Sequence, residues 1–333
     1  MPIDMIKLNP PSYQLQKIPL SRIDTGDDTY RITTRTTVDD LLASIRLDGL
    51  LNRPFVIAAS DGFVVVSGFR RIAACKILGM EEIMVRVLDP DLNSLEYLRV
   101  AIADNALQRP LDLLETSRAL QKLAAQISSD RRLIDSTSSL GLPSNPSVIK
   151  KLIDLGLLSQ NIQQAVMDDS ISLSTAMELK DLPPECAAAF AQLFGEFKLS
   201  LNKQRQILTL VKEIARRDGI SEQTVLEGRQ LQDIMSDRER DRGQRARELR
   251  TYLRQRRFPH IVKAETRFEN QRKQLNLGSD IHLIPPENFE GTNYTLNLTF
   301  SSVSQLKTLG AKLDQLIQHP ALKQILEGQD TTS

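Results

Sequence analysis

The feature that most constrains the fold is a change of pattern near Ser94. Before this residue, short runs rich in Val and Ile alternate with amphipathic segments, which is typical of a small α/β domain. After it, helical periodicity continues to about residue 219 without a strand pattern. These two patterns belong to different architectures, so a chain of 333 residues is predicted to contain two or more domains.

Residues 16–93 are predicted to form the α/β domain. A Ser-Asp-Gly turn at residues 60–62 separates two apolar strand patterns and indicates a hairpin. Thr37 and Asp40 have the spacing of a capping box at the start of a helix, and Gly49 is placed to end that helix. The fifteen residues before this domain, 1–15, are predicted to be flexible.

Residues 94–220 are predicted to form a helical domain that contains a helix-turn-helix. Asp112 and Glu115 have the spacing of a cap at the start of one of its helices. Asn145 is placed to cap the second helix of that motif, and Pro146 suits its first position. Residues 221–244 have few apolar positions and are predicted to be a charged linker. Two strand patterns between helical ones predict an α-β-β-α domain at 245–327, so the predicted fold class is α+β multidomain.

The composition excludes several classes of protein. No run of 18 apolar residues exists, so no transmembrane helix is expected, and the N-terminus lacks the pattern of a signal peptide. Cys75 and Cys186 are the only cysteines, which favours a reducing cytoplasm over a disulfide scaffold. The 3 histidines lie far apart in the sequence and do not have metal-ligand spacing.

The net charge of +1 hides an uneven distribution of charge. Residues 245–263 carry a cluster of arginines with a single acidic residue, Glu248. Such a block can bind a polyanion, and the alternative is a solvated helix face. Arg254, Arg256 and Arg257 are therefore candidates for contact with DNA phosphates.

The stretch VVVSGFRR, residues 64–71, ends a strand pattern at Gly68 and starts a helix with two arginines. A helix start exposes free N–H groups that favour phosphate, and Arg70 and Arg71 would add charged contacts. The alternative is a surface turn whose arginines pair with nearby acids. A P-loop is excluded because no GxxxxGK[ST] motif occurs.

Two further stretches flank this turn in the sequence. DGLLNRPFVI, residues 48–57, links a helix to a strand. AIADNALQRPLDLLE, residues 101–115, places Asp104 and Asn105 side by side, and their oxygens suit Mg²⁺ held partly by phosphates. Each stretch taken alone also fits a purely structural role, as a connection or as the capped end of a helix.

Together and in this order, the three stretches resemble the ParB family of chromosome- and plasmid-partition proteins. Its ParB/sulfiredoxin-like domain carries a Gly-(Ile/Leu)-x-x-Pro box, a Gly-Glu-Arg-Arg turn and a Glu-Asn-x-Gln-Arg box. Here one extra residue precedes Pro54, Phe69 replaces the Glu of the turn, and Gln108-Arg109 is displaced by one residue. The resemblance continues through ISLSTA at 171–176 and, more loosely, through the C-terminal dimerisation domain of the family.

The resemblance implies a first domain that binds CTP with Mg²⁺. The implied nucleotide-binding residues are Gly49, Leu50, Leu51, Pro54, Gly68, Phe69, Arg70, Arg71 and Asn105. Asp104 and Asn105 would hold the metal, so residues 94–115 would complete the site. Since Phe69 can neither orient water nor hold a metal, we expect CTP hydrolysis to be weak or absent.

The resemblance also favours DNA binding by the helix that begins near Asn145. The candidates for DNA contact are Ser144, Asn145, Ser147, Lys150 and Lys151. Ser and Asn side chains can contact base edges, whereas lysines favour phosphates. The implied protein is a homodimeric clamp on double-stranded DNA, switched by the nucleotide and partnered by a ParA-type ATPase. It is expected in the bacterial cytoplasm and nucleoid, with no membrane partner.

Two other functions fit parts of the same sequence. A site-specific transcription or plasmid regulator would keep this fold as a scaffold and bind no nucleotide. A metal-dependent nuclease would use Asp104 and neighbouring acids to hold a catalytic metal, although the sequence has no dense acidic cluster there. Sulfiredoxin activity is not expected, because Cys75 lies within the helix rather than at the turn.

Overall fold

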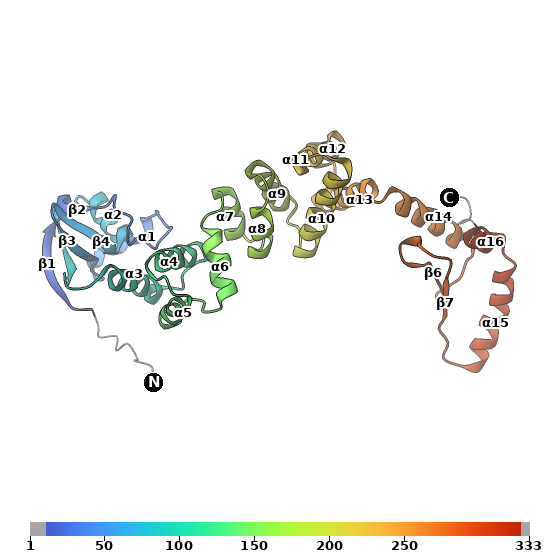
Figure 1. Cartoon of the computed structure of the whole chain (residues 1–333), viewed down its shortest axis with the longest axis horizontal. Helices are drawn as coiled ribbons and strands as arrows, with labels where there is room; N and C mark the ends of the chain where they lie inside the picture. The colour runs from blue at the N-terminus through green and yellow to red at the C-terminus, as the bar shows by residue number, and fades with distance from the viewer. Residues whose placement is uncertain (1–10, 328–333) are drawn as a thin grey trace. The chain divides into compact units, whose positions relative to one another are not determined.

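The computed structural model describes residues 11–327, whose elements are labelled in Figure 1. The chain divides into two compact units, residues 1–201 and 202–333. Of the segment predicted to be flexible, residues 1–10 lie outside the described residues, and strand β1 already begins at Tyr13.

The first unit starts with a five-stranded sheet of order β1-β5-β3-β4-β2. Its strands are β1 (Tyr13–Pro19), β2 (Ile23–Asp24), β3 (Phe55–Ala59), β4 (Gly62–Ser67) and β5 (Glu82–Leu88). The β1–β5 and β3–β4 pairs are antiparallel, and the β3–β5 and β2–β4 pairs are parallel. The hairpin between β3 and β4 confirms the turn predicted at residues 60–62. Gly68 directly follows the last residue of β4, Ser67.

Helices α1 (Asp39–Asp48) and α2 (Phe69–Ile77) contribute to the core of this sheet. Ile72 and Cys75 of α2 are fully buried among Val56, Val65 and Val85 of the strands. Burial raises the pKa of the Cys75 thiol, so this cysteine packs in the core, as predicted. The core fixes the orientation of α2, and therefore the position of its N-terminal turn.

Helices make up the rest of the first unit, which confirms a mixed α and β chain with a helical remainder. They are α3 (Ser94–Gln108), α4 (Leu113–Gln126), α5 (Asp130–Ser139), α6 (Pro146–Leu155), α7 (Gln160–Met167), α8 (Leu173–Lys180) and α9 (Pro184–Phe197). Capping boxes start α3 and α4, at Asn93 and Asp112. The segment before α1 is bound to α4, because Lys122 donates to the carbonyls of Asp28 and Thr29.

The second unit begins within α10 (Leu201–Asp218) and continues with α11 (Glu222–Leu226), α12 (Arg229–Ser236) and α13 (Arg242–Arg257). Residues 221–244, predicted as a charged linker, contain α11, α12 and the start of α13. Val225, Leu226 and Leu231 are buried, and these few apolar side chains are enough to fold the segment.

The end of the second unit contains the predicted pair of strands. Its elements are α14 (Pro259–Gln274), β6 (Ile281–Ile284), β7 (Thr295–Leu298), α15 (Val303–Ile317) and α16 (Pro320–Glu327). β6 and β7 are antiparallel, and Phe268, Leu283, Leu316 and Ile325 form a small core around them. Pro320 separates α15 from α16 and begins the latter, a helix that the sequence pattern did not predict. Within residues 11–327, no helix is long and apolar enough to cross a membrane.

Candidate functional site

The turn between β4 and α2 depends on Gly68, whose φ is +99°. A Cβ atom at this position would lie 2.9 Å from Cβ and 3.0 Å from Cα of Pro54. A larger residue would therefore clash with Pro54 in a backbone conformation that side chains disfavour. This contact joins the Gly49–Pro54 stretch to the start of α2, where the first N–H groups of the helix have no intrahelical acceptor.

Arg71 joins the same turn to the third stretch. Its guanidinium donates to the carbonyl of Asn52 at 2.9 Å and to Oδ2 of Asp104 at 2.8 Å. The side chains of Arg71 and Asp104 are only 10% and 12% exposed, so this ion pair is largely desolvated. Ser67 also donates to Asp104, at 2.5 Å. The structure thus brings all three predicted stretches together around one arginine.

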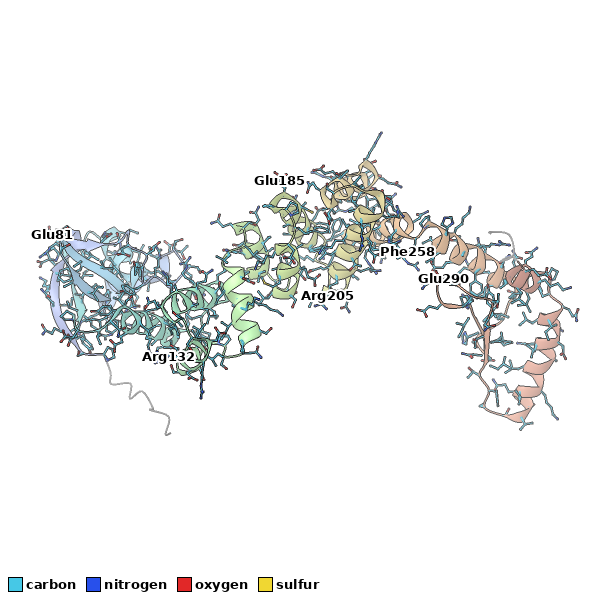
Figure 2. All side chains as sticks on the ribbon, in the orientation of Figure 1. Glu81, Arg132, Glu185, Arg205, Phe258 and Glu290 are labelled. Atoms are coloured by element: carbon cyan, nitrogen blue, oxygen red, sulfur yellow. The ribbon has the colours of Figure 1, made fainter. Side chains whose placement is uncertain are left out.

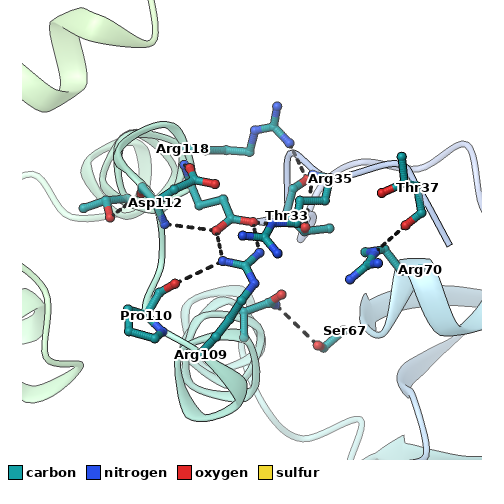
Figure 3. Close-up of polar contacts among 12 residues, drawn as sticks. Thr33, Arg35, Thr37, Ser67, Arg70, Arg109, Pro110, Asp112 and Arg118 are labelled. Carbon is teal, nitrogen blue, oxygen red and sulfur yellow. Dashed lines mark hydrogen bonds and ion pairs between the residues drawn. The ribbon is translucent and has the colours of Figure 1, made fainter. Parts of the chain in front are cut away.

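Arg70 points to a different part of the site. It donates to the carbonyl of Thr37 at 2.7 Å, as Figure 3 shows. It also contacts the carboxylate of Asp40. The hydrogen bond from Arg70 lowers the pKa of Asp40. Thr37 and Asp40 were predicted to form a capping box, but Val38 is the N-cap of α1 and no side chain caps it. These two residues hold Arg70 instead.

Asp104 and Asn105 lie at the same place but are already engaged with protein groups. The hydrogen bonds from described side chains to the carboxylate of Asp104 all reach Oδ2: they come from Ser67, from Arg71 and, at 3.2 Å, from Gln108. Asn105 donates through Nδ2 to the carbonyl of Ala101 at 2.7 Å. Within residues 11–327, no group of three or more His, Cys, Asp or Glu side chains could hold a metal ion. Two oxygens, Oδ1 of Asp104 and Oδ1 of Asn105, are too few to hold Mg²⁺ by themselves, so a metal here would need further ligands such as phosphate oxygens.

A buried ion pair that the sequence analysis did not identify lies beside this site. Glu115 is fully buried and accepts hydrogen bonds from Arg109 at 2.7 and 2.5 Å and from Thr33 at 3.1 Å. Burial alone would raise the pKa of Glu115, but Arg109, the N–H of Asp112 and Thr33 together lower it to about 2. The spacing of Asp112 and Glu115 indicated a helix cap, which the structure has, and gave no sign of Arg109 as a partner.

Further arginines surround Glu115 in Figure 3. Arg118 of α4 donates to the carbonyl of Thr33 at 2.8 Å. Arg35 is exposed, and its backbone N–H donates to Thr33 Oγ1 at 3.2 Å. With Arg70 and Arg109, these side chains come from separate segments of the first unit. Guanidinium groups outnumber carboxylates here, so the region favours a polyanionic ligand.

The remaining residues predicted at the nucleotide site have different roles. Gly49 has a φ of +75° and ends α1, as predicted. Leu50 packs against the core, whereas Leu51 is 76% exposed. Phe69 is buried in the core, and the guanidinium of Arg31 lies 5.3 Å from its ring centroid. The role of Phe69 at the nucleotide site stays a prediction, and the ring itself packs in the core of the domain.

The predicted DNA-binding helix is α6, and its N-terminal end is accessible. Ser144, Asn145, Ser147 and Lys150 are exposed and Lys151 is half-buried. The opposite side of α6 carries the buried side chains Ile149, Leu152 and Leu155. Asn145 caps the helix through Oδ1, which accepts hydrogen bonds from the N–H groups of Ser147 and Val148. Its side-chain NH2 group remains available to contact a base. Figure 2 shows Arg132 projecting outward from the preceding helix, α5.

The arginines predicted to bind DNA from α13 are paired with acids of the second unit. Arg254 contacts Glu265, Arg256 contacts Asp218 at 3.1 Å, and Arg257 contacts Glu213 at 2.8 Å. All of these side chains remain at least one-quarter exposed. A phosphate contact would therefore compete with an ion pair at each of the three positions.

Comparison with known proteins supports the resemblance carried by the three stretches. Residues 7–106 match the family model described as the ParB N-terminal domain. A probable chromosome 1-partitioning protein ParB from Deinococcus radiodurans is 28% identical over 165 residues, which are 46% of this chain and 56% of that protein. The match thus spans little more than half the length of this relative.

Two solved structures of the C-terminally truncated chromosome-partitioning protein ParB from Caulobacter crescentus are also similar. The one complexed with CTP-gamma-S is 22% identical with a TM-score of 0.26, and it covers 54% of this chain and 98% of that chain. The one complexed to the centromeric parS site is 18% identical with a TM-score of 0.36. The match covers 57% of this chain and 96% of that chain. Scores of this size do not pair individual residues, so the site rests on the contacts described above.

Proposed function

Because residues 7–106 belong to the ParB N-terminal domain family, we propose that this chain is a ParB-like partition protein. In this proposal, CTP bound with Mg²⁺ switches a dimeric DNA clamp that loads at a specific site. The observation that carries the proposal is the position of Arg71, which lies in the turn after Gly68 and donates hydrogen bonds to Asn52 and Asp104. Partition as the biological role rests on the relative from Deinococcus radiodurans, which bears that name.

The arginine cluster supports a triphosphate as the ligand. The N-terminal turn of α2 offers free N–H groups. Arg70 belongs to this turn and is bound to Thr37, while Arg35 lies on the segment that precedes α1. Arg70 is held by Thr37 and Asp40, both of which are exposed, so a phosphate can replace Asp40 at little cost. Arg71 is better suited to fixing the turn than to contacting phosphate, because two of its nitrogens already donate to Asn52 and Asp104. The choice of cytosine as the base rests on the family.

Mg²⁺ would neutralise the phosphates and fix their position relative to Asp104 and Asn105. The chain itself positions these two residues through Ser67 and Arg71. We expect weak or absent hydrolysis, because no carboxylate occupies position 69 and Phe69 is packed in the core. Binding energy would then be used to shift the protein between open and closed conformations rather than to drive rapid chemistry.

DNA binding is proposed for α5 and α6. The exposed end of α6 carries hydroxyl, amide and ammonium groups, and its apolar side packs inward, as a recognition helix requires. Lys150 and Lys151 would contact phosphates, while Ser144 and Ser147 would contact base edges.

Dimerisation is proposed for the C-terminal part of the second unit. Val303 and Ile317 of α15 are 72% and 52% exposed, and Phe300 is 50% exposed. Several exposed apolar side chains on such a small domain favour an interface that buries them, and a second copy of the chain would provide one. A ParA-type ATPase as a further partner rests on the family alone.

Calorimetric titration of the intact chain with CTP and Mg²⁺ tests the proposal. We expect saturable heat with CTP and a lower affinity without the metal. No heat with CTP, together with sequence-specific DNA binding, would contradict the nucleotide switch and favour the regulator. Incubation with supercoiled plasmid and Mg²⁺ is the parallel control, and nicking that disappears in Asp104→Ala would favour the nuclease.

A further inference from the structure

Strand β1 forms one edge of the five-stranded sheet, as Figure 1 shows, and neither the proposed nucleotide site nor the proposed DNA surface uses it. It pairs with β5 on one side, and in the described part of the chain no strand lies on its other side. The register with β5 has no bulge, and residues 13–17 are all exposed. A regular, exposed edge of this length can pair with another extended segment.

The register of β1 shows which of its backbone groups face the open side. The carbonyl of Ser12 accepts a hydrogen bond from the N–H of Asp89 on the β5 side, at 3.2 Å. In an antiparallel pair the hydrogen-bonded positions alternate along the strand, so the even-numbered residues of β1 bond to β5. The N–H and C=O groups of Tyr13, Leu15 and Lys17 consequently point to the open side.

Two prolines limit the part of this edge that can pair. Pro11 precedes β1 and Pro19 ends it. Both have odd numbers, so the N–H group that each proline lacks would belong to the open side. Pro11 and Pro19 each lie four residues from Leu15. The stretch that can pair is therefore centred on Leu15.

The side chains of this stretch carry little net charge. Tyr13 and Leu15 are 46% and 51% exposed. The guanidinium of Arg86 lies 5.4 Å from the ring centroid of Tyr13 and holds the ring against the sheet. Lys17 is the one charged residue of the strand, and its ammonium group pairs with Glu82 at 2.7 Å. Because Glu82 offsets this charge, the edge does not repel a neighbouring strand strongly.

We propose that β1 pairs antiparallel with β1 of a second copy of this chain, about a twofold axis at Leu15. Leu15 then lies opposite Leu15 of the second copy, and Tyr13 lies opposite Lys17. Both backbone groups of these residues gain partners, and the prolines fall outside the ladder. A register centred on Lys17 would instead bring two ammonium groups together and place Pro19 in the ladder.

The charges and amide groups of the strand are complementary in this arrangement. Each Lys17 would lie beside the ring of Tyr13 of the other copy, where a cation is favoured, and far from the other Lys17. On the opposite face, Gln14 would lie opposite Gln16, and their amide groups can donate and accept hydrogen bonds reciprocally. A twofold contact requires a surface that is complementary to itself, and this strand meets that requirement.

This contact is distinct from the dimerisation proposed for the second unit, because it joins two first units. A single pair of strands is a small interface and binds weakly by itself. A link between the same two copies elsewhere in the chain would raise the local concentration of β1 and favour the pairing. The inference depends neither on the nucleotide nor on the C-terminal interface.

Cysteine cross-linking of the intact chain tests the pairing and its register. Cys75 and Cys186 are buried, so an introduced exposed cysteine would be oxidised in preference to them. Hydrogen-bonded partners in an antiparallel pair have Cα atoms about 5.5 Å apart, which suits a disulfide. Leu15→Cys should therefore give a covalent dimer on mild oxidation with diamide. Leu15 lies outside the core, so this variant keeps the fold.

Lys17→Cys is the matched control, because position 17 is exposed on the same face of the same strand. In the proposed register the two copies of position 17 lie about 14 Å apart. That distance exceeds the reach of a disulfide, so Lys17→Cys should give about tenfold less covalent dimer than Leu15→Cys. Equal cross-linking of the two variants would indicate random collision and would overturn the proposal. No cross-linking in Leu15→Cys would also overturn it, and is the result expected if the edge binds a different protein.

Hydrogen exchange gives a second readout. The amides of Gln14 and Gln16 should be protected by β5 in every variant, whereas those of Tyr13 and Lys17 should be protected only by the second copy. Leu15→Lys places two like charges at the twofold axis and should remove the protection of Tyr13 and Lys17 alone. Protection of these two amides that persists in Leu15→Lys would show that another segment covers the edge, and would contradict pairing with a second copy.

Discussion

Two regions of this chain are rich in arginine, but the structure uses them differently. Around Gly68, the arginines come from the segment before α1, from α2, from the end of α3 and from α4, and they gather near three carboxylates. On α13, the arginines come from a single helix, and Arg254, Arg256 and Arg257 each have an acidic partner. The first arrangement leaves an excess of positive charge in one place, whereas the second is largely neutralised.

The difference shows that arginine density in a sequence does not by itself indicate an anion site. What matters is the number of carboxylates that the fold brings to the same place, and how deeply they are buried. Glu115 is fully buried, whereas the side chain of Glu265, the partner of Arg254, is 35% exposed. An ion pair in the first region should therefore affect stability far more than one in the second.

The largest effect is expected for Glu115→Gln. Removing the carboxylate leaves Arg109 without its main partner beside a buried site, at a cost of about 3 kcal/mol in unfolding free energy. Hydrogen exchange of the amides of β3, β4 and α4 in the intact chain measures this loss. Glu265→Gln is the control from the second region and should change stability by less than about 1 kcal/mol. Equal losses in the two variants would remove the distinction between the regions.

Lowering the pH should weaken the first region through the same residue. The pKa of Glu115 falls from 4.5 to about 2 on folding, so its carboxylate stabilises the folded state above pH 4.5. That contribution, about 3 kcal/mol, should be lost as the pH falls from 4.5 towards 2. Exchange rates measured at pH 6, 4 and 3 should show the loss in the unaltered chain and a smaller one in Glu115→Gln. A pH profile identical in both would contradict this role for Glu115.

Replacing Gly68 should damage the site and the fold together. Gly68→Ala combines a φ of +99° with a contact of 2.9 Å to Pro54, so we expect a loss of about 2 kcal/mol and weaker CTP binding. In Gly79→Ala, φ is +69° and no atom lies within 4 Å of the added Cβ. This control should lose about 1 kcal/mol and keep its nucleotide affinity. Thermal unfolding and calorimetry distinguish the two variants, and similar CTP affinities would argue against the Gly68–Pro54 contact as part of the site.

The smallest effect on stability is expected for Arg35→Ala, which should instead change binding. Arg35 is exposed, so its removal should leave the unfolding temperature unchanged. If it contacts the triphosphate, CTP affinity should fall about tenfold, as for the loss of one charged hydrogen bond. Arg256→Ala, from the second region, should leave CTP affinity unchanged. A loss of CTP affinity in Arg256→Ala but not in Arg35→Ala would mean that the second region, and not the first, binds the nucleotide.

The sequence predicted the parts of the fold that depend on local pattern. The β3–β4 hairpin, the Asp112–Glu115 cap and the strands near residues 281–298 all follow from spacing and turn residues. The order of the three stretches also indicated correctly that they come together. Contacts between distant parts of the sequence could not be predicted in this way. Glu115 and Thr33 are 82 residues apart, and nothing in either local pattern indicates that they form a hydrogen bond.

The same limit applies to the partners of individual side chains near the site. Thr37 and Asp40 have the spacing of a helix cap. In the structure both bind Arg70, which lies 30 residues beyond Asp40. Phe69 directly follows Gly68, in a turn whose sequence is compatible with exposure. Its burial becomes clear only in the structure, where Phe69 packs in the same core as Ile72 and Cys75. Sequence spacing predicts which residues share an element, whereas their partners depend on tertiary packing.

Hydrogen exchange with and without CTP and Mg²⁺ tests the central claim, that Arg71 joins the three stretches into one nucleotide site. We predict slower exchange in all three stretches together, at residues 49–54, 67–72 and 104–109, when CTP is added to the intact chain. Protection confined to one stretch, or found only in the second unit, would contradict the claim.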